Sequence, residues 1–183
     1  MSAVPDAYPQ RIVCLTEEPT EVLYAIGEEH RIVGISGFTV RPPQARREKP
    51  KVSAFTSAKI GAILDLQPDL VIGFSDIQAD IARDLIRAGV EVWISNHRSV
   101  AGILAYIRRL GAMVGAADKA EALALRAEHH LEAVAEAEGI HGTGAGAADA
   151  LEGEVAFFKQ GIKHAPSEGA MRPAALQGEV DRR

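Results

Sequence analysis

The chain has 183 residues, of which 47% are hydrophobic and 25% are charged, and it carries a formal net charge of −5 and one cysteine. This composition is typical of a globular domain, and it excludes a disordered chain, an intramolecular disulfide framework and a strongly basic nucleic-acid-binding surface. No apolar run approaches the ~20 residues that a membrane-spanning helix needs, so no membrane insertion is expected.

The amino-terminal part of the chain predicts one strand followed by one helix. The opening stretch, MSAVPDAYPQR, has neither the basic nor the apolar part of a secretory signal, which predicts a cytoplasmic protein. An apolar run then follows, RIVCL at 11–15, typical of a strand buried on both faces of a parallel sheet. Cys14 lies in this run and is interpreted as a buried thiol that acts as a small hydrophobe. A helical pattern from Thr20 to Ala25 ends at Gly27, which suits a helix C-cap.

Apolar runs alternate with helical patterns along the next part of the chain. The further runs are RIVGIS at 31–36, DLVIGF at 69–74 and VEVWIS at 90–95. This strand–helix–strand repetition predicts an α/β fold, with a doubly wound, mostly parallel sheet in a lobe at residues 9–116.

The helices between these strands have recognisable starts. One helical pattern covers 57–66, and others begin at Ser75 or Asp76 and at Ser99, which are suitable N-caps. The helix after Ser75 should bury one stripe of apolar residues, namely Ile77, Ile81, Leu85 and Ile86. The segment RPPQARREKPK at 41–51 is predicted to be a solvated loop.

The last third of the chain has a different character. An Ala/Glu-rich segment with Leu123, Leu131 and Val134 at helical spacing predicts one long amphipathic helix over 117–138. Adjacent residues on a helix point about 100° apart, so the neighbours His129 and His130 do not form a chelating pair. Residues 139–183 are rich in Gly, Ala, Pro and charge, and are predicted to be a linker and a poorly ordered tail.

Three phenylalanines fall at or near the predicted strand exits, and they indicate a binding surface. In doubly wound sheets, ligands lie outside the carboxyl ends of the strands. Phe38, Phe55 and Phe74 at these exits predict an apolar platform for a ligand. The paired Glu17 and Glu18 are explained by a helix start, where carboxylates are favoured. No catalytic residue and no metal site is predicted, so the protein is expected not to be an enzyme.

Four segments, in their order along the chain, resemble one known family. RIVCLTEEPTEVLYAIGEEHRIVGIS, GISGFTVRPPQAR, VSAFTSAKIGAILDLQPDLVIGF and LIRAGVEVWIS are similar to the amino-terminal lobe of the cobalamin and iron-siderophore substrate-binding proteins of ABC importers. This resemblance covers roughly residues 9–136. It implies that the long helix is the backbone helix that joins two lobes, with the ligand bound in the cleft between them.

The resemblance also implies the ligand, its contacts and a partner. A corrinoid or a ferric siderophore would be the ligand, and no other cofactor is expected. Phe38, Phe55 and Phe74 would stack on the ligand, and Arg41 and Asn96 would be polar contacts. The membrane subunits of an ABC transporter would be the partner. At the position where relatives offer an acidic docking residue this chain has Gly61, which weakens that partnership.

The second lobe of the family has no counterpart in the sequence pattern after residue 138, so a truncated binding lobe is expected. Two alternatives stay open. One is a small α/β enzyme or regulatory domain with an acidic site at the sheet edge, formed by Asp76 or by Glu17 and Glu18. The other is a structural remnant that dimerises through the apolar face of the long helix.

Overall fold

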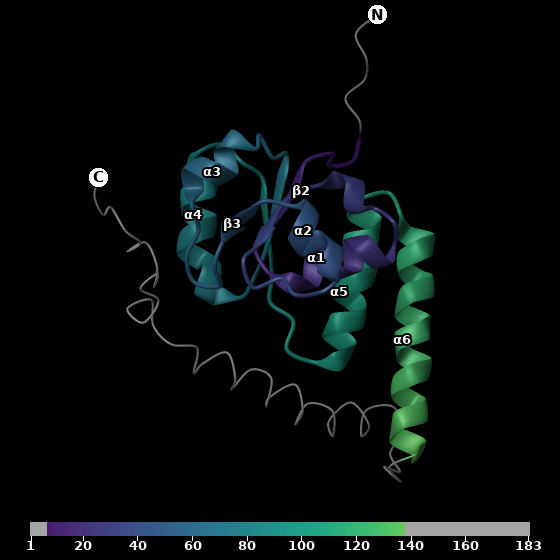
Figure 1. Cartoon of the computed structure of the whole chain (residues 1–183). Helices are drawn as coiled ribbons and strands as arrows, with labels where there is room; N and C mark the ends of the chain where they lie inside the picture. The colour runs from purple at the N-terminus through teal and green to yellow at the C-terminus, as the bar shows by residue number, and fades with distance from the viewer. Residues whose placement is uncertain (1–6, 138–183) are drawn as a thin grey trace, which may run out of the picture.

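The computed structural model describes residues 7–137, and a parallel sheet forms its centre (Figure 1). Its five strands are β1 (Ile12–Cys14), β2 (Ile32–Ser36), β3 (Lys51–Ser53), β4 (Leu70–Phe74) and β5 (Val92–Ser95), arranged in the order β3-β2-β1-β4-β5. Every pairing between neighbouring strands is parallel. The chain thus builds outward from β1 to β3, and then outward on the other side of β1 through β4 and β5. This order confirms a doubly wound sheet, whose topological switch point lies between β1 and β4.

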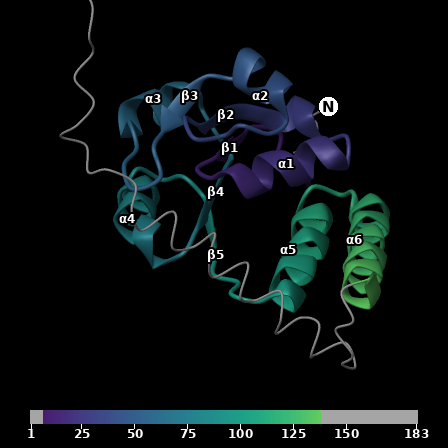
Figure 2. The same cartoon turned by 60° about the horizontal axis from the view of Figure 1, so that its bottom comes forward.

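Helices cover both faces of this sheet. They are α1 (Glu17–Ala25), α2 (Pro43–Glu48), α3 (Ile60–Asp65), α4 (Ala79–Arg87), α5 (Val100–Met113) and α6 (Ala117–Ala137), with 3₁₀ turns η1 (Glu29–Arg31) and η2 (Asp76–Gln78). Figure 2 shows α3 and α4 on one side, with α1, α5 and α6 on the other. α6 packs outside α5, as a further layer.

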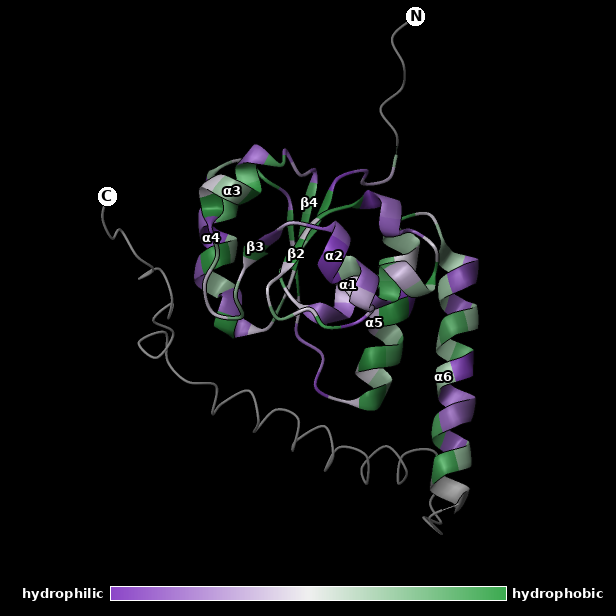
Figure 3. Cartoon of the chain, in the orientation of Figure 1, coloured by the Kyte–Doolittle hydropathy of each residue, from purple (hydrophilic) through white to green (hydrophobic). Residues whose placement is uncertain are grey.

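Alternating side chains of the central strand divide the core into two halves. Ile12 and Cys14 pack with α1, α5 and α6, while Val13 and Leu15 pack with α3 and α4. All four are 0% exposed, as expected for a strand covered on both faces. The interpretation of Cys14 as a buried thiol is therefore confirmed. Figure 3 shows hydrophobic residues along β4 of the sheet and on α5.

The long helix is fixed to the lobe along α5. A Cβ built on Gly111 of α5 would lie 2.1 Å from the Cβ of Ala120, so the two helices approach closely only because residue 111 is a glycine. The Arg108 guanidinium donates hydrogen bonds to Glu121 and to Glu128 of α6. At the start of α6, Lys119 Nζ donates to Glu28 Oε1 at 2.9 Å. These contacts hold the first half of α6 against the lobe.

Predicted elements and observed ones differ in a few places. The predicted loop at 41–51 contains α2 and reaches the edge strand β3, and neither element was expected. Ile77 and Ile86 were predicted to be buried, but they are 47% and 60% exposed. The 3₁₀ turn η2 breaks the helical phase before α4, so Gln78 takes the buried place that Ile77 was expected to have. The predicted linker and tail at 139–183 lie outside the described residues.

Candidate functional site

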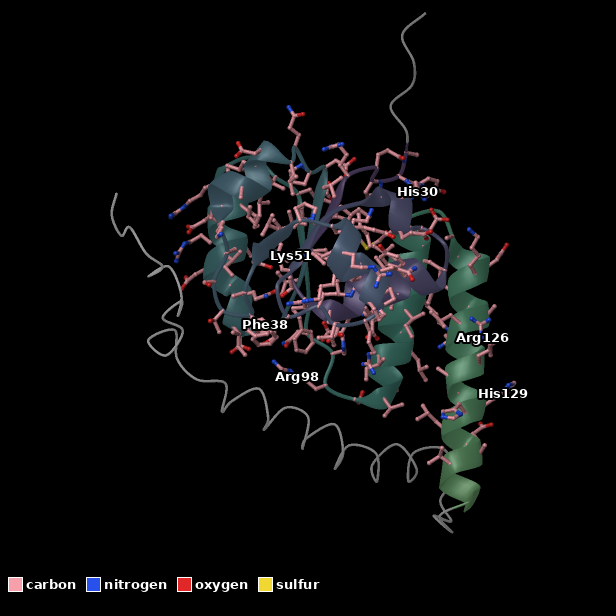
Figure 4. The ribbon with its side chains drawn as sticks, in the orientation of Figure 1. His30, Phe38, Lys51, Arg98, Arg126 and His129 are labelled. Carbon is pink, nitrogen blue, oxygen red and sulfur yellow. The ribbon has the colours of Figure 1, made fainter. Side chains whose placement is uncertain are left out.

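The predicted site residues all lie on the segments that leave the carboxyl ends of the strands. Figure 4 shows Phe38 and Arg98 at this end of the sheet, which is called the carboxyl edge below, and His30 at the opposite end. Phe38 follows β2, Phe55 follows β3, Phe74 ends β4 and Asn96 follows β5, while Arg41 precedes α2. The parallel sheet thus gathers residues that are up to 58 positions apart in sequence, from 38 to 96, along one edge.

A connected row of aromatic rings begins at Phe74 on this edge and runs into the core. The Phe74 and His97 ring centroids are 4.9 Å apart, as are those of His97 and Tyr106, and Tyr106 stacks on Trp93 at 5.2 Å. Tilted and offset arrangements of this kind are the favoured ones for ring pairs. Within residues 7–137, Phe38 and Phe55 make no ring–ring contact. The structure therefore joins Phe74 to His97 and Tyr106, and it leaves the other two phenylalanines as separate rings on the same edge.

Apolar surface is exposed beside this ring set. Phe38, Val40 and Ile77 are 58%, 57% and 47% exposed, and Phe55 and Phe74 are half-buried. The Phe38 loop is held at the edge because Gly37 N–H donates to Ser53 O at 2.7 Å and Phe38 N–H donates to Ser36 Oγ at 3.2 Å. Exposed apolar side chains that gather on one side of a protein are typical of a surface for another molecule, and Phe38, Val40 and Ile77 all follow strand ends at the carboxyl edge.

The guanidinium of Arg98 lies over the ring of Phe74. The Arg98 guanidinium carbon is 5.4 Å from the Phe74 ring centroid, and Nη2 donates to Asn96 Oδ1 at 2.7 Å and to Asp76 Oδ1 at 3.3 Å. The Ser75 hydroxyl, followed by the Arg98 guanidinium, holds the pKa of Asp76 below its ordinary value. Asn96, predicted as a polar ligand contact, is thus part of a hydrogen-bonded group that positions Arg98.

Arg41 faces a different part of the surface. It lines an open groove between α1 and α2, together with Glu21, Tyr24, Pro42 and Pro43. Its Nε donates to Glu21 Oε1 at 2.6 Å. Burial raises the pKa of Glu21, and the hydrogen bond from Arg41 offsets only part of this rise.

Four residues that shape this edge were given no role in the site from the sequence: Gln78, His97, Arg98 and Tyr106. His97 and Arg98 follow a strand end directly, which was the one local signal that could have identified them. Tyr106 lies inside α5 and Gln78 in a 3₁₀ turn, so only the three-dimensional fold brings these two to the site.

Residues 7–137 contain no group of three or more His, Cys, Asp and Glu side chains placed to hold a metal ion. His129 and His130 are exposed on α6, as predicted for a solvated helix face. The described helices all fall short of the length and apolar character that crossing a bilayer requires.

Comparison with known proteins identifies relatives over the same part of the chain. The curated relatives include a vitamin B12-binding protein of Vibrio campbellii, 31% identical over 102 residues, which cover 55% of this chain and 37% of that protein. An uncharacterized ABC transporter substrate-binding lipoprotein of Bacillus subtilis is 28% identical over 119 residues, covering 63% of this chain and 37% of that protein. This chain therefore spans little more than a third of the length of either relative.

The fold of the lobe is also found in solved structures. A periplasmic heme-binding protein from Pseudomonas aeruginosa superposes with a TM-score of 0.64 at 26% identity, over 70% of this chain and 46% of that protein. The family model described as "Periplasmic binding protein" matches residues 12–139, which is well over half of the chain. The chain belongs to the periplasmic binding protein family, and residues 12–137 have the fold of one lobe with its long helix.

Proposed function

We propose that this chain is the amino-terminal lobe of a substrate-binding protein that takes a large, flat ligand of the corrinoid or heme class, or a ferric siderophore. The observation that carries the proposal is the connected ring set Phe74–His97–Tyr106 at the carboxyl edge of the doubly wound sheet. The names of the relatives, a vitamin B12-binding and a heme-binding protein, support a macrocyclic ligand.

The chemistry of the edge suits such a ligand. Aromatic and aliphatic side chains stack on a macrocycle without a demanding set of directional hydrogen bonds. Phe38, Phe55 and Phe74 are proposed as the ligand-facing rings, because the first is well exposed and the other two are half-buried at the same edge. Asn96 is proposed to act on the ligand indirectly, because it accepts a hydrogen bond from Arg98. Arg41, which lines the α1–α2 groove, is proposed as a polar contact at the margin of the ligand site.

A lobe by itself offers one wall of a two-lobed cleft. The ligand then keeps about half of its contacts, so affinity is expected to lie orders of magnitude below that of a two-lobed protein. Isothermal titration of the chain with cyanocobalamin, with hemin and with a ferric hydroxamate siderophore tests the proposal. We expect at least one of them to bind at micromolar concentration. No binding signal from any of the three at high micromolar concentration would overturn the proposal.

Two variants link any binding signal to the proposed edge. Phe74→Ala removes the phenylalanine of the ring set and should weaken binding about tenfold or more, since buried aromatic contacts dominate interface energies. Ile86→Ala is the matched control, because Ile86 is 60% exposed on α4 and lies outside the ring set. Equal losses of affinity in both variants would show that the ligand does not bind at the carboxyl edge.

The partner and the compartment belong to the same proposal. Substrate-binding proteins deliver small ligands to the membrane subunits of an ABC transporter, and the Bacillus subtilis relative carries that name. Gly61 is exposed on α3, and a Cβ built on it would meet no atom within 4 Å, so Gly61→Glu could place an acid there without a clash. If the missing acid limits docking, that variant should bind the importer more tightly than the natural chain.

The expected cytoplasmic location gains no support from relatives named as periplasmic or as a lipoprotein. An importer's binding protein meets its ligand outside the cytoplasmic membrane, so we propose that this protein works there. Cell fractionation with an antibody against the lobe tests this, and recovery in the cytosol alone would restore the original expectation.

The two alternative functions have weaker support. Asp76 is fully exposed, and its pKa is held low by Ser75 and Arg98, which does not suit a general base at neutral pH. Glu17 Oε1 accepts hydrogen bonds from the backbone of Val40 and Arg41, which is a structural role. The inner face of α6 at Ala120 and Ala124 is fully buried against the lobe, so this part of the helix is closed to a second copy.

A further inference from the structure

Gln78 occupies the centre of the candidate site, although it touches no solvent. Its side chain is 0% exposed and lies at the switch point between β1 and β4. Oε1 accepts a hydrogen bond from Phe74 N–H at 2.9 Å, while Nε2 donates to Phe55 O at 3.0 Å and to Leu15 O at 3.3 Å. One amide group thereby connects the exits of β1, β3 and β4.

The surrounding backbone is shaped to admit this side chain. A Cβ built on Gly73 would lie 2.5 Å from Gln78 Oε1, so only a glycine leaves room for the amide. Ser75 has a φ of +68°, an uncommon conformation for a residue with a side chain. This left-handed turn is held in place because Ser75 N–H donates to Ser95 O at 2.7 Å. It begins η2, which returns the chain toward the sheet and directs Gln78 inward.

An amide is the side chain that fits these three backbone groups. The groups are one N–H and two carbonyls at the end of the sheet, beyond the backbone ladder, and buried backbone groups without partners are costly. Leu15 O also accepts from Ser53 Oγ at 3.4 Å, so the amide shares this carbonyl. A glutamine supplies one acceptor and two donors, which matches this set. A carboxylate of the same shape could accept from Phe74 N–H, but it would repel the two carbonyls.

We propose that Gln78 is a positioning residue, which fixes the exits of β3 and β4 relative to each other and so sets the placement of the Phe55 and Phe74 rings for a flat ligand. The inference rests on the proposed function for the ligand, but the ring placement is a property of the free protein. Because Gln78 fills the switch point, where doubly wound sheets often admit a ligand, contact is left to the rings outside it.

The test compares two variants with a core control. Gln78→Glu keeps the shape and loses the donors, whereas Gln78→Met loses every hydrogen bond of the side chain. Ile63→Val and Ile63→Ala are the controls, because Ile63 is 0% exposed in α3 and makes none of these hydrogen bonds. Each Gln78 variant is compared with the Ile63 variant whose urea midpoint is closest to its own. The two proteins compared then have a similar loss of stability.

The first readout is fluorine NMR of the free protein labelled with 4-fluorophenylalanine, which reports on each of the five phenylalanines. In both Gln78 variants the Phe55 and Phe74 resonances should shift, while the Phe38 resonance stays, because no hydrogen bond from Gln78 reaches its loop. The matched Ile63 control should leave the Phe55 and Phe74 resonances in place. Unmoved Phe55 and Phe74 resonances in both Gln78 variants would overturn the proposal.

Acidification adds a readout that a loss of packing would not produce. Burial favours the protonated form of the carboxyl in Gln78→Glu, and that form can donate one hydrogen bond to a carbonyl. Lowering the pH should therefore return the Phe55 resonance of Gln78→Glu toward that of the natural chain, and leave the Phe55 resonance of Gln78→Met unchanged. The Phe74 resonance is not used in this comparison, because the titratable imidazole of His97 lies against that ring. A pH response of the Phe55 resonance shared by both variants would contradict the hydrogen-bond role.

The second readout is titration with cyanocobalamin, hemin or the ferric hydroxamate siderophore, whichever the natural chain binds. Gln78→Met should lose about tenfold in affinity, the equivalent of one net hydrogen bond of ~1.4 kcal/mol, and the matched Ile63 control should lose little. A natural chain that binds none of cyanocobalamin, hemin and the ferric hydroxamate siderophore would refute the proposed function alone, since the NMR readout still decides whether Gln78 positions the rings. Shifted Phe55 and Phe74 resonances together with an unchanged affinity would show that the ring placement set by Gln78 does not affect ligand binding.

Discussion

Gly111 of α5 and Ala120 of α6 lie so close together that any side chain at residue 111 would overlap the Ala120 methyl group, at a Cβ–Cβ distance of 2.1 Å. Gly111→Ala should therefore push the helices apart and lower the free energy of unfolding by about 1–3 kcal/mol, the usual cost of overpacking. Urea denaturation measures this. Gly61→Ala is the control: it lies in α3 with open space around it and should be neutral or stabilising by up to ~1 kcal/mol.

Removing the imidazole of His97 should disturb the ring set and leave the fold intact. His97→Ala deletes contacts to Phe74 and Tyr106, each worth about 0.5–1.5 kcal/mol in ring pairs. The expected loss in the free energy of unfolding is therefore about 1–3 kcal/mol. The fluorescence of Trp93, the chain's one tryptophan, follows unfolding and also reports on the ring set, because it stacks on Tyr106. An unchanged emission spectrum together with an unchanged midpoint would contradict the contacts.

Acid should loosen the attachment of α6 through Glu28. Burial raises the pKa of this carboxyl, but hydrogen bonds from Arg31 and Lys119 outweigh burial, and the pKa lies below its ordinary value. A carboxyl with a lowered pKa contributes stability that is present above the unfolded-state pKa, about 4.3, and is lost as the pH falls through the folded-state value. His30 Nε2 also lies 3.9 Å from the same carboxylate.

Unfolding by urea at a series of pH values from 7 down to about 3 checks this. The natural chain should lose more stability over the acid range than Glu28→Gln, which cannot titrate at this position. Parallel pH profiles for the two proteins would show that Glu28 does not contribute.

Cys14 should be inert in the native protein. The thiol is fully buried, and burial raises its pKa to about 12, with only a partial offset from Thr20 and Lys49. Since the thiolate is the reactive form, labelling by iodoacetamide should be negligible in buffer and rapid in urea. Modification of the folded protein at the rate of a free thiol would contradict the burial of β1.

The strands and most helices were predictable because their signals are local. The apolar runs at 11–15, 31–36, 69–74 and 90–95 each contain an observed strand, and Ser99 caps α5 by accepting from Gly102 N–H at 3.1 Å. Gly27 ends α1 with a φ of +74°, as its position indicated. The edge strand β3 was missed because Lys51–Ser53 is too short to show a pattern.

The site was predictable only in outline. The order of the strands was enough to place Phe38, Phe55 and Phe74 at strand exits. Their contacts, however, depend on turns that the sequence pattern does not predict. The positive φ of Ser75 turns Ile77 outward and Gln78 inward, which reverses the arrangement that helical spacing predicts. Arg98 over Phe74, and His97 against Tyr106, depend on how the connection between β5 and α5 packs on the end of β4 and on α5.

α6 runs from the end of the lobe near His30 toward the end that carries Phe38 and Arg98 (Figure 4). The carboxyl end of α6 therefore lies toward the side of the lobe that carries Phe38 and Arg98. For biosensor or pull-down work, a surface attachment on the opposite side of the lobe, near His30, would leave this edge open to solution (Figure 4).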